Sequence, residues 1–239
     1  ATYLLILYST FLTRSGVLGE TSVHSFTDLG LSGQLLLFLG LFLIGCIALC
    51  AYEWKKIPTT EQEMEAYSRE FWIFLGATVL SLMAFQILIP TSIPVYNEIL
   101  GLFGVDSNLA PPADPVGFYS KFQLWFAVAI AVLSGTGQFF WWKKMDLKKF
   151  RAEIQNPLIV SLLISAAIFI LAEVREVPYM ILLTASVYTI VANAAILWSL
   201  KRTSLKLSGG SVAHMGVGLM LIGILFSSGY SKILSKNTT

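Results

Sequence analysis

Long runs of apolar residues, broken by short polar segments, dominate the pattern of this chain. Six runs approach the length of about 20 residues that a helix needs to cross a bilayer core. They lie at approximately 33–54, 71–90, 121–142, 157–173, 178–200 and 211–230, bounded by charged, proline or Gly/Ser-rich segments. A shorter apolar run at 1–12 is typical of the end of a longer helix. We therefore expect an all-α membrane bundle with six full helices and one partial N-terminal helix.

Composition agrees with lipid as the main solvent of the chain. Of 239 residues, 56% are hydrophobic and only 13% are charged, whereas about 25% is usual for soluble domains. A net charge of +2, with no basic face or tract, excludes nucleic-acid binding as a main role. Two cysteines and two histidines leave little material for a disulfide framework or a multi-ligand metal site.

Basic residues are concentrated in alternate loops. Eleven of the 16 Lys and Arg residues fall in the loops at 55–70, 143–156 and 201–210. The positive-inside rule places these loops in the cytoplasm. The outer side then holds 13–32, 91–120, 174–177 and the C-terminal tail. In the longest of these, the run NEILGLFGV predicts either a short helix on the membrane surface or a segment that only joins two helices.

The two histidines are the most informative side chains, because an imidazole can bind metal or haem iron and is costly in lipid without a partner. His24 lies in the outer segment after the first helix, and His214 lies near the cytoplasmic end of the last span. At a rise of about 1.5 Å per residue along the last span, His24 and His214 lie roughly 25 Å apart in depth. One haem iron therefore cannot easily bind both histidines. Each also fits a structural role, as a solvated loop residue or a helix-start residue. Gly216 and Gly218 leave room for a flat ligand or for close helix packing.

Other polar or aromatic groups have structural and functional interpretations. Arg14 is either an interfacial anchor or the partner of a carboxylate such as a haem propionate. Ser68 is expected to cap the next helix, with Glu70 near its positive end. For Cys46 and Cys50, packing between helices is favoured over a redox role. The aromatic groups at helix ends, Phe139, Phe140, Trp141, Trp142, Tyr52 and Trp54, are expected to anchor the chain at the membrane interface.

Several motifs together resemble the CcmF family, the integral-membrane haem lyases of cytochrome c maturation. They are TFLTRSGVL followed by SVHSF, SRE before the next span, IPVYNEI in the outer loop, and AHMGVGLMLIGI in the last span. The resemblance implies that His24 holds the incoming haem at the outer face. It implies that His214 binds a resident b-type haem in the membrane, which reduces the incoming haem iron.

The family joins haem vinyl groups to the two thiols of a CXXCH site in an apocytochrome. We therefore expect His24 and Arg14 to serve catalysis, His24, His214 and Gly216 to bind cofactor, and the two histidines to ligate haem iron. The expected cofactors are a resident haem b and haem as substrate.

The chain also lacks features of that family, namely the tryptophan-rich WWD segment and the second histidine of each pair. It is thus expected to be a single transmembrane haem-lyase-like domain over 1–239, without the family's upstream WWD-containing half and downstream outer soluble domain. It is expected to be either a C-terminal-half fragment or one subunit of a split protein, inactive alone. Expected partners are the upstream half, a haem chaperone, apocytochrome c with its thiol-reducing and delivery proteins, and the lipid bilayer. The expected location is the bacterial inner membrane or an organellar equivalent, with periplasmic outer loops. A transporter fragment and a scaffold that only recruits partners are the competing hypotheses, and bound haem would distinguish them.

Overall fold

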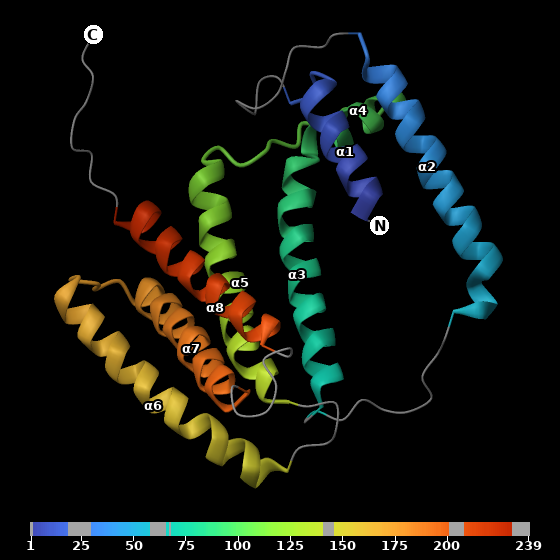
Figure 1. The fold of residues 1–239 in the computed structure, drawn as a ribbon. Helices are drawn as coiled ribbons and strands as arrows, with labels where there is room; N and C mark the ends of the chain where they lie inside the picture. Colours follow the sequence, from blue (N-terminus) through green and yellow to red (C-terminus); the bar gives the residue numbers. More distant parts are fainter. Residues whose placement is uncertain are drawn as a thin grey trace, which may run out of the picture. The chain divides into compact units, whose positions relative to one another are not determined.

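The computed structural model describes residues 2–18, 30–57, 66, 68–140, 146–200 and 208–230. All regular elements in these ranges are helices (Figure 1). Six of them are long and apolar enough to cross a membrane: Ser32–Lys56, Arg69–Thr91, Pro115–Phe139, Leu147–Leu171, Val177–Leu200 and Gly209–Gly229. The expected all-α fold with six spans is therefore confirmed, and the chain is an integral membrane protein.

The helices pack as two compact units. One consists of Ala1–Glu63 and Leu88–Pro115, and the other of Met64–Ile87 and Val116–Thr239. These units are packing clusters, so the single functional domain expected over 1–239 stays a prediction. Each unit is described by itself.

The first unit contains the N-terminal helix α1 (Thr2–Arg14), the span α2 (Ser32–Glu53) with its 3-10 extension η1 (Trp54–Lys56), and the short helix α4 (Ile93–Leu102). Phe11, Leu12 and Leu18 form its small core. A partly buried hydroxyl pair adds a polar contact, since Tyr8 Oη donates to Ser92 Oγ at 2.6 Å. In this unit α1 thus packs against α2, and Tyr8 adds a contact to Ser92, the residue before α4.

The outer loop contains the predicted short helix, which begins at Ile93 rather than at residue 97. Its following segment is folded back by side-chain bonds: Asn97 Nδ2 donates to Leu109 O at 2.8 Å, and Ser107 Oγ donates to Asn97 Oδ1 at 2.8 Å. Gly104 has a φ of +72°, a turn conformation that favours glycine. The helical interpretation of this loop is confirmed, and its place on the membrane surface stays a prediction.

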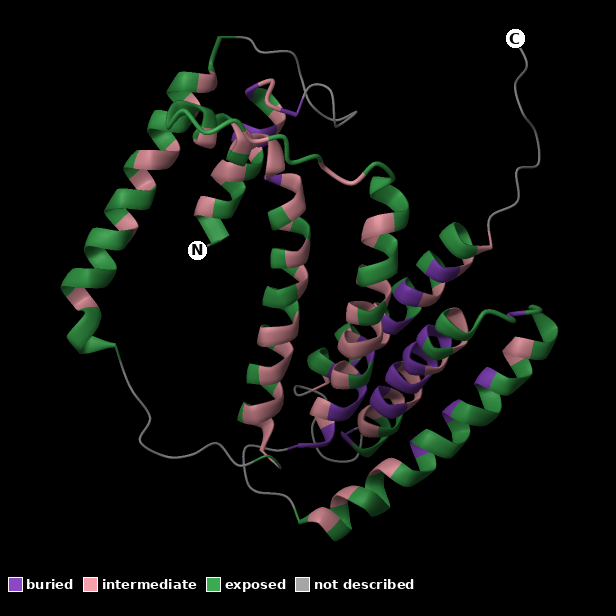
Figure 2. Cartoon of the chain, turned by 180° about the vertical axis from the view of Figure 1, so that it is seen from behind, coloured by how far each residue is buried: buried purple, intermediate pink, exposed green. Residues whose placement is uncertain are grey.

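The second unit is built around α7 (Val177–Leu200), which packs against α6 (Leu147–Leu171) and α8 (Gly209–Ile224). No other described helix has as many buried residues, and they lie along its length (Figure 2). Helices α3 (Arg69–Thr91) and α5 (Pro115–Thr136) complete the membrane part, α5 ending in the 3-10 turn η2 (Gly137–Phe139). A π-helical turn, η4 (Leu225–Gly229), ends α8. α7 is therefore the central helix of this unit.

One predicted boundary was wrong by ten residues, because α6 begins at Leu147 and not at 157. Asp146 caps it, with Oδ1 accepting from Lys148 N at 3.4 Å, and Lys149 pairs with Glu153 at 3.9 Å. The charged residues at 147–156, predicted as loop, therefore form the first turns of a helix. Pro157 lies inside that helix and does not start it. Its ring removes one backbone donor, but the helix continues on both sides.

The expected interfacial role of Phe139 and Phe140 was also wrong. Both side chains are buried, with exposed fractions of 5% and 1%. Phe140 stacks on Trp72 with ring centroids 5.1 Å apart, and on Phe150 at 4.8 Å. The tight η2 turn at the end of α5 brings this pair back among the helices. Trp141 and Trp142 lie outside the described residues.

Candidate functional site

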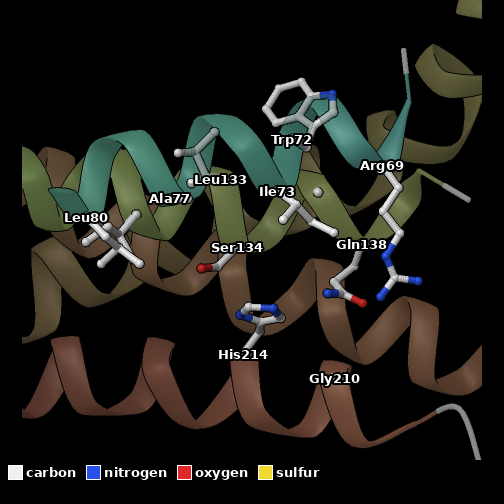
Figure 3. Close-up of a pocket in the computed structure, with 13 residues that line it drawn as sticks. Arg69, Trp72, Ile73, Ala77, Leu80, Leu133, Ser134, Gln138, Gly210 and His214 are labelled. Atoms are coloured by element: carbon white, nitrogen blue, oxygen red, sulfur yellow. The ribbon is translucent and has the colours of Figure 1, made fainter. Parts of the chain in front are cut away.

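A cavity of about 520 Å³ lies within the second unit, against α3, α5 and α8 (Figure 3). His214 stands in the second turn of α8 and its imidazole projects into this space. The lining residues are Arg69, Trp72, Ile73, Gly76, Ala77, Leu80, Ile130, Leu133, Ser134, Gly137, Gln138, Gly210 and His214. The volume falls within the range of about 300–1,000 Å³ that is usual for small-molecule sites.

Most of the wall is apolar. Trp72, Ile73 and Leu80 come from one face of α3, and Ile130 and Leu133 from α5. Gly76 also lines the space, and a Cβ placed there would meet no atom within 4 Å. The cavity therefore suits a largely apolar ligand.

Four polar side chains interrupt this wall, from Arg69, Ser134, Gln138 and His214. The guanidinium of Arg69, the amide of Gln138 and the imidazole of His214 all project toward the same space (Figure 3). Neither Asp nor Glu is among the described lining residues. The polar side chains that the structure describes around this cavity are thus cationic or neutral.

Arg69 is the site residue that sequence reasoning missed. The expected cap is confirmed, because Ser68 Oγ accepts a hydrogen bond from Phe71 N at 3.3 Å and α3 begins at Arg69. Their roles at the start of α3 explain why Ser68 and Glu70 stand where they do. Nothing in the sequence indicates the direction of the Arg69 side chain. The SRE string alone therefore could not place Arg69 in a cavity.

Side chains of α7 hold the α5 wall of the cavity in place. Thr189 Oγ1 donates to Ala131 O at 2.6 Å, and Asn193 Nδ2 donates to Ser134 O at 3.1 Å. Thr136 and Tyr188 share a further buried bond of 3.1 Å between their hydroxyls. These contacts fix α5 at the point where it tightens into η2 and presents Gln138.

Of the predicted site residues that the structure describes, only His214 lines the cavity. Gly216 is exposed and lies outside the cavity lining. Gly218 instead packs closely on α7, because a Cβ there would lie 2.9 Å from Ser186 O. Arg14 ends α1 in the first unit and is exposed. His24 lies outside the described residues.

Among the described residues that line the cavity, the imidazole of His214 is the single strong metal ligand. The described residues hold no cluster of three or more His, Cys, Asp or Glu that could bind a metal ion. A macrocycle that brings its own equatorial ligands needs only one or two protein donors, so one imidazole in an apolar cavity suits it better than a bare ion.

Similarity to known proteins covers nearly the whole chain. The chain is 29% identical over 233 residues to the cytochrome c-type biogenesis protein CcmF of Escherichia coli. The alignment covers 95% of this chain and 34% of that protein. Identity is 26% over 242 residues with CcmF of Haemophilus influenzae, covering 95% of this chain and 36% of that protein. This chain is similar to CcmF proteins over nearly its whole length.

A third relative is the cytochrome c-type biogenesis protein ccl1 of Rhodobacter capsulatus, 27% identical over 91% of this chain and 33% of that protein. The chain thus spans about a third of the length of CcmF and these other curated relatives. No family model and no solved structure matches it. The resemblance to CcmF found in the motifs is confirmed.

Proposed function

We propose that this chain is the part of a cytochrome c biogenesis protein that binds haem within the membrane, with His214 as an axial ligand to the iron. The observation that carries the proposal is the imidazole of His214 in an apolar cavity of about 520 Å³. The CcmF names of its relatives supply the biological context. A bound b-type haem would supply one-electron chemistry at this position.

The residues present fit this group. A neutral imidazole is a common axial ligand of haem iron, and the walls from α3 and α5 match an apolar macrocycle. No second histidine, methionine or cysteine is among the described lining residues. We propose that an upstream segment, carried on the same polypeptide or on a separate subunit, supplies the second axial ligand, and that the chain alone is inactive.

At the outer face we propose haem as the substrate, held by His24 with Arg14 on a propionate. In the proposed lyase reaction each thiol of a CXXCH site adds across a vinyl double bond. A carbon–sulfur bond forms, and the proton is taken by the other vinyl carbon. The contribution of the protein is to position the reactants rather than to transfer protons through a side-chain dyad.

The partners in this proposal are a haem chaperone, apocytochrome c and its thiol-reducing and delivery proteins. The chain would lie in a bacterial inner membrane or its organellar equivalent, with the outer loops in the periplasm. Gly216 is retained only as a predicted contributor to the haem site, because it does not line the cavity.

The test is a reduced-minus-oxidised absorption spectrum of the chain produced in membranes with its upstream segment. We expect a low-spin b-type spectrum that is lost in His214→Ala and restored when imidazole is added to His214→Gly. Met215→Leu is the matched control, since it removes the thioether of the residue next to His214, which does not line the cavity. A spectrum unchanged in His214→Ala would refute the assignment. Absence of haem from the intact protein would favour the transporter or scaffold hypotheses.

A further inference from the structure

We infer that Arg69 and Gln138 form a carboxylate-binding subsite at one end of the cavity, which fixes the direction in which its ligand lies. The inference rests on the proposed function and deepens it: the carboxylate is a propionate of the haem whose iron His214 binds. It concerns residues for which the sequence predicted no ligand role.

The cavity is polar at one end and apolar at the other. Arg69 is the first residue of α3, Gln138 lies in the η2 turn that ends α5, and Gly210 lies in the first turn of α8. Leu80 is eleven residues further along α3, about 16 Å away along the helix axis. A ligand with one charged edge and an apolar body can therefore lie in this cavity in only one favourable direction.

His214 lies close to the polar end. It is four residues after Gly210, about one turn along α8. Figure 3 shows its imidazole beside the amide of Gln138, with the guanidinium of Arg69 beyond. A macrocycle bound to His214 thus has its charged edge within the region of Arg69 and Gln138.

The chemistry of the polar end matches a carboxylate. Arginine presents a planar fork of N–H donors that binds carboxylates through two parallel bonds, and a glutamine amide adds further donors. Among the described residues that line the cavity, Arg69 is the one with a permanent positive charge, and none is acidic. Attraction between opposite charges is stronger in such a partly buried place than in water.

Gly210 contributes by its small size. A Cβ at this position would lie 3.3 Å from Oε1 and 3.6 Å from Nε2 of Gln138. A Cβ at 210 would therefore require the Gln138 amide to shift by a few tenths of an ångström, so the glycine leaves room for this amide at the end of the cavity.

An anionic lipid headgroup has the same chemistry as a propionate, and the test must separate the two. The purified protein, with its upstream segment, is loaded either with haem or with haem whose two propionates are methyl esters. Affinities are compared for the parent protein, Arg69→Gln, Arg69→Lys and Gln138→Leu. Arg151→Gln is the matched control, because Arg151 is exposed and outside the cavity.

We expect the parent protein and Arg151→Gln to bind free-acid haem about tenfold or more tightly than the ester, the size of a charge-assisted hydrogen bond. Arg69→Gln should lose this preference, Arg69→Lys should keep part of it, and Gln138→Leu should reduce it. The ester should still give the His214-dependent spectrum in every variant that folds.

Three results would overturn the inference. Equal affinity of the parent protein for both pigments excludes a carboxylate subsite. If Arg69→Gln weakens the binding of free-acid haem and of the ester equally, while Gln138→Leu keeps the preference for the free acid, Arg69 has a structural role. A preference seen in phosphatidylcholine nanodiscs but absent with phosphatidylglycerol identifies a lipid headgroup as the occupant. Failure to bind either pigment refutes the proposed function itself, which is a distinct outcome.

Discussion

Two glycines of α8, separated by one residue, have opposite surroundings. A Cβ at Gly218 would lie 2.8 Å from Ile190 Cγ1 and 2.9 Å from the backbone oxygen of Ser186, whereas one at Gly216 would meet nothing within 4 Å. Gly218→Ala should therefore destabilise the protein by about 1–3 kcal/mol through overpacking of α7 against α8. Gly216→Ala should be neutral or stabilising by up to about 1 kcal/mol, because alanine favours helix.

The measurement is unfolding of each variant in detergent micelles, followed by helical circular dichroism. Equal stability of Gly218→Ala and Gly216→Ala would contradict the close contact. Haem content of Gly216→Ala, measured in parallel, also tests the predicted cofactor role of Gly216. A loss of haem from a variant that is fully stable would support that role.

Single residues divide into those with a sequence signal and those without one. His214 could be predicted because an imidazole near the end of an apolar span is unusual. Arg69 could not, because charged residues are ordinary at helix starts and only the packing of α3, α5 and α8 brings its side chain to a cavity. The different roles of Gly216 and Gly218 likewise depend on which face of α8 contacts α7.

Threonines on α7 test how this helix holds α5. Thr189 Oγ1 donates across the interface to Ala131 O at 2.6 Å and also lies 2.9 Å from Ala185 O in its own helix. Thr184 Oγ1 donates to Met180 O, four residues earlier in its own helix, at 2.8 Å. Thr189→Val should destabilise the protein by about 0.6 kcal/mol and at most about 1.7, the measured range for interhelical bonds in membranes. Thr184→Val should cost less, since no contact between helices is lost.

A double-mutant comparison at equal detergent concentration provides the measurement. The unfolding free energy of each valine variant is determined alone and together with Gly218→Ala, which acts on a different contact of α7. Additive effects are expected for independent contacts. If Thr184→Val costs as much as Thr189→Val, the bond to Ala131 does not hold the two helices together.

The early start of α6 gives a second prediction about an element. With a helix from Leu147, amide hydrogens from about residue 151 onward are bonded within it and should exchange slowly. Asp146→Ala removes the cap and should speed exchange over the first two turns, at a cost of about 1 kcal/mol, while Asp146→Asn should not. Hydrogen exchange by mass spectrometry measures both effects. Fast exchange across 147–156 in the parent protein would support the loop that the charge pattern first indicated.

Helix number and approximate position could be predicted from apolar run length, and their ends could not. A lysine-rich stretch before Pro157 resembles a cytoplasmic loop, yet Asp146 and the Lys149–Glu153 pair stabilise it as helix. The aromatic residues at the end of α5 show the same limit. Phe140 is an ordinary interfacial residue by sequence, and its burial depends on Trp72 and Phe150 from other helices.

Across the whole molecule, the distribution of basic residues predicts which helix ends face the cytoplasm. The test uses a background in which Cys46 and Cys50, the two cysteines of the chain, are replaced by alanine. Single cysteines are then introduced by Asp106→Cys in the predicted outer loop and Lys148→Cys at the start of α6, both exposed positions. A membrane-impermeant maleimide should label Asp106→Cys in intact cells, and Lys148→Cys only after the membrane is opened.

The result decides the depth of the His214 cavity as well as the orientation. Arg69, Gln138 and Gly210 lie at the ends of α3, η2 and α8 that adjoin the predicted cytoplasmic loops. If Lys148→Cys is protected in intact cells, the cavity lies toward the cytoplasm, roughly 25 Å in depth from the outer segment that contains His24. If both histidines bind haem iron as proposed, two haem positions are then required, one for each histidine. If Lys148→Cys is labelled from outside and Asp106→Cys is not, the orientation is reversed, and the segment containing His24 faces the cytoplasm.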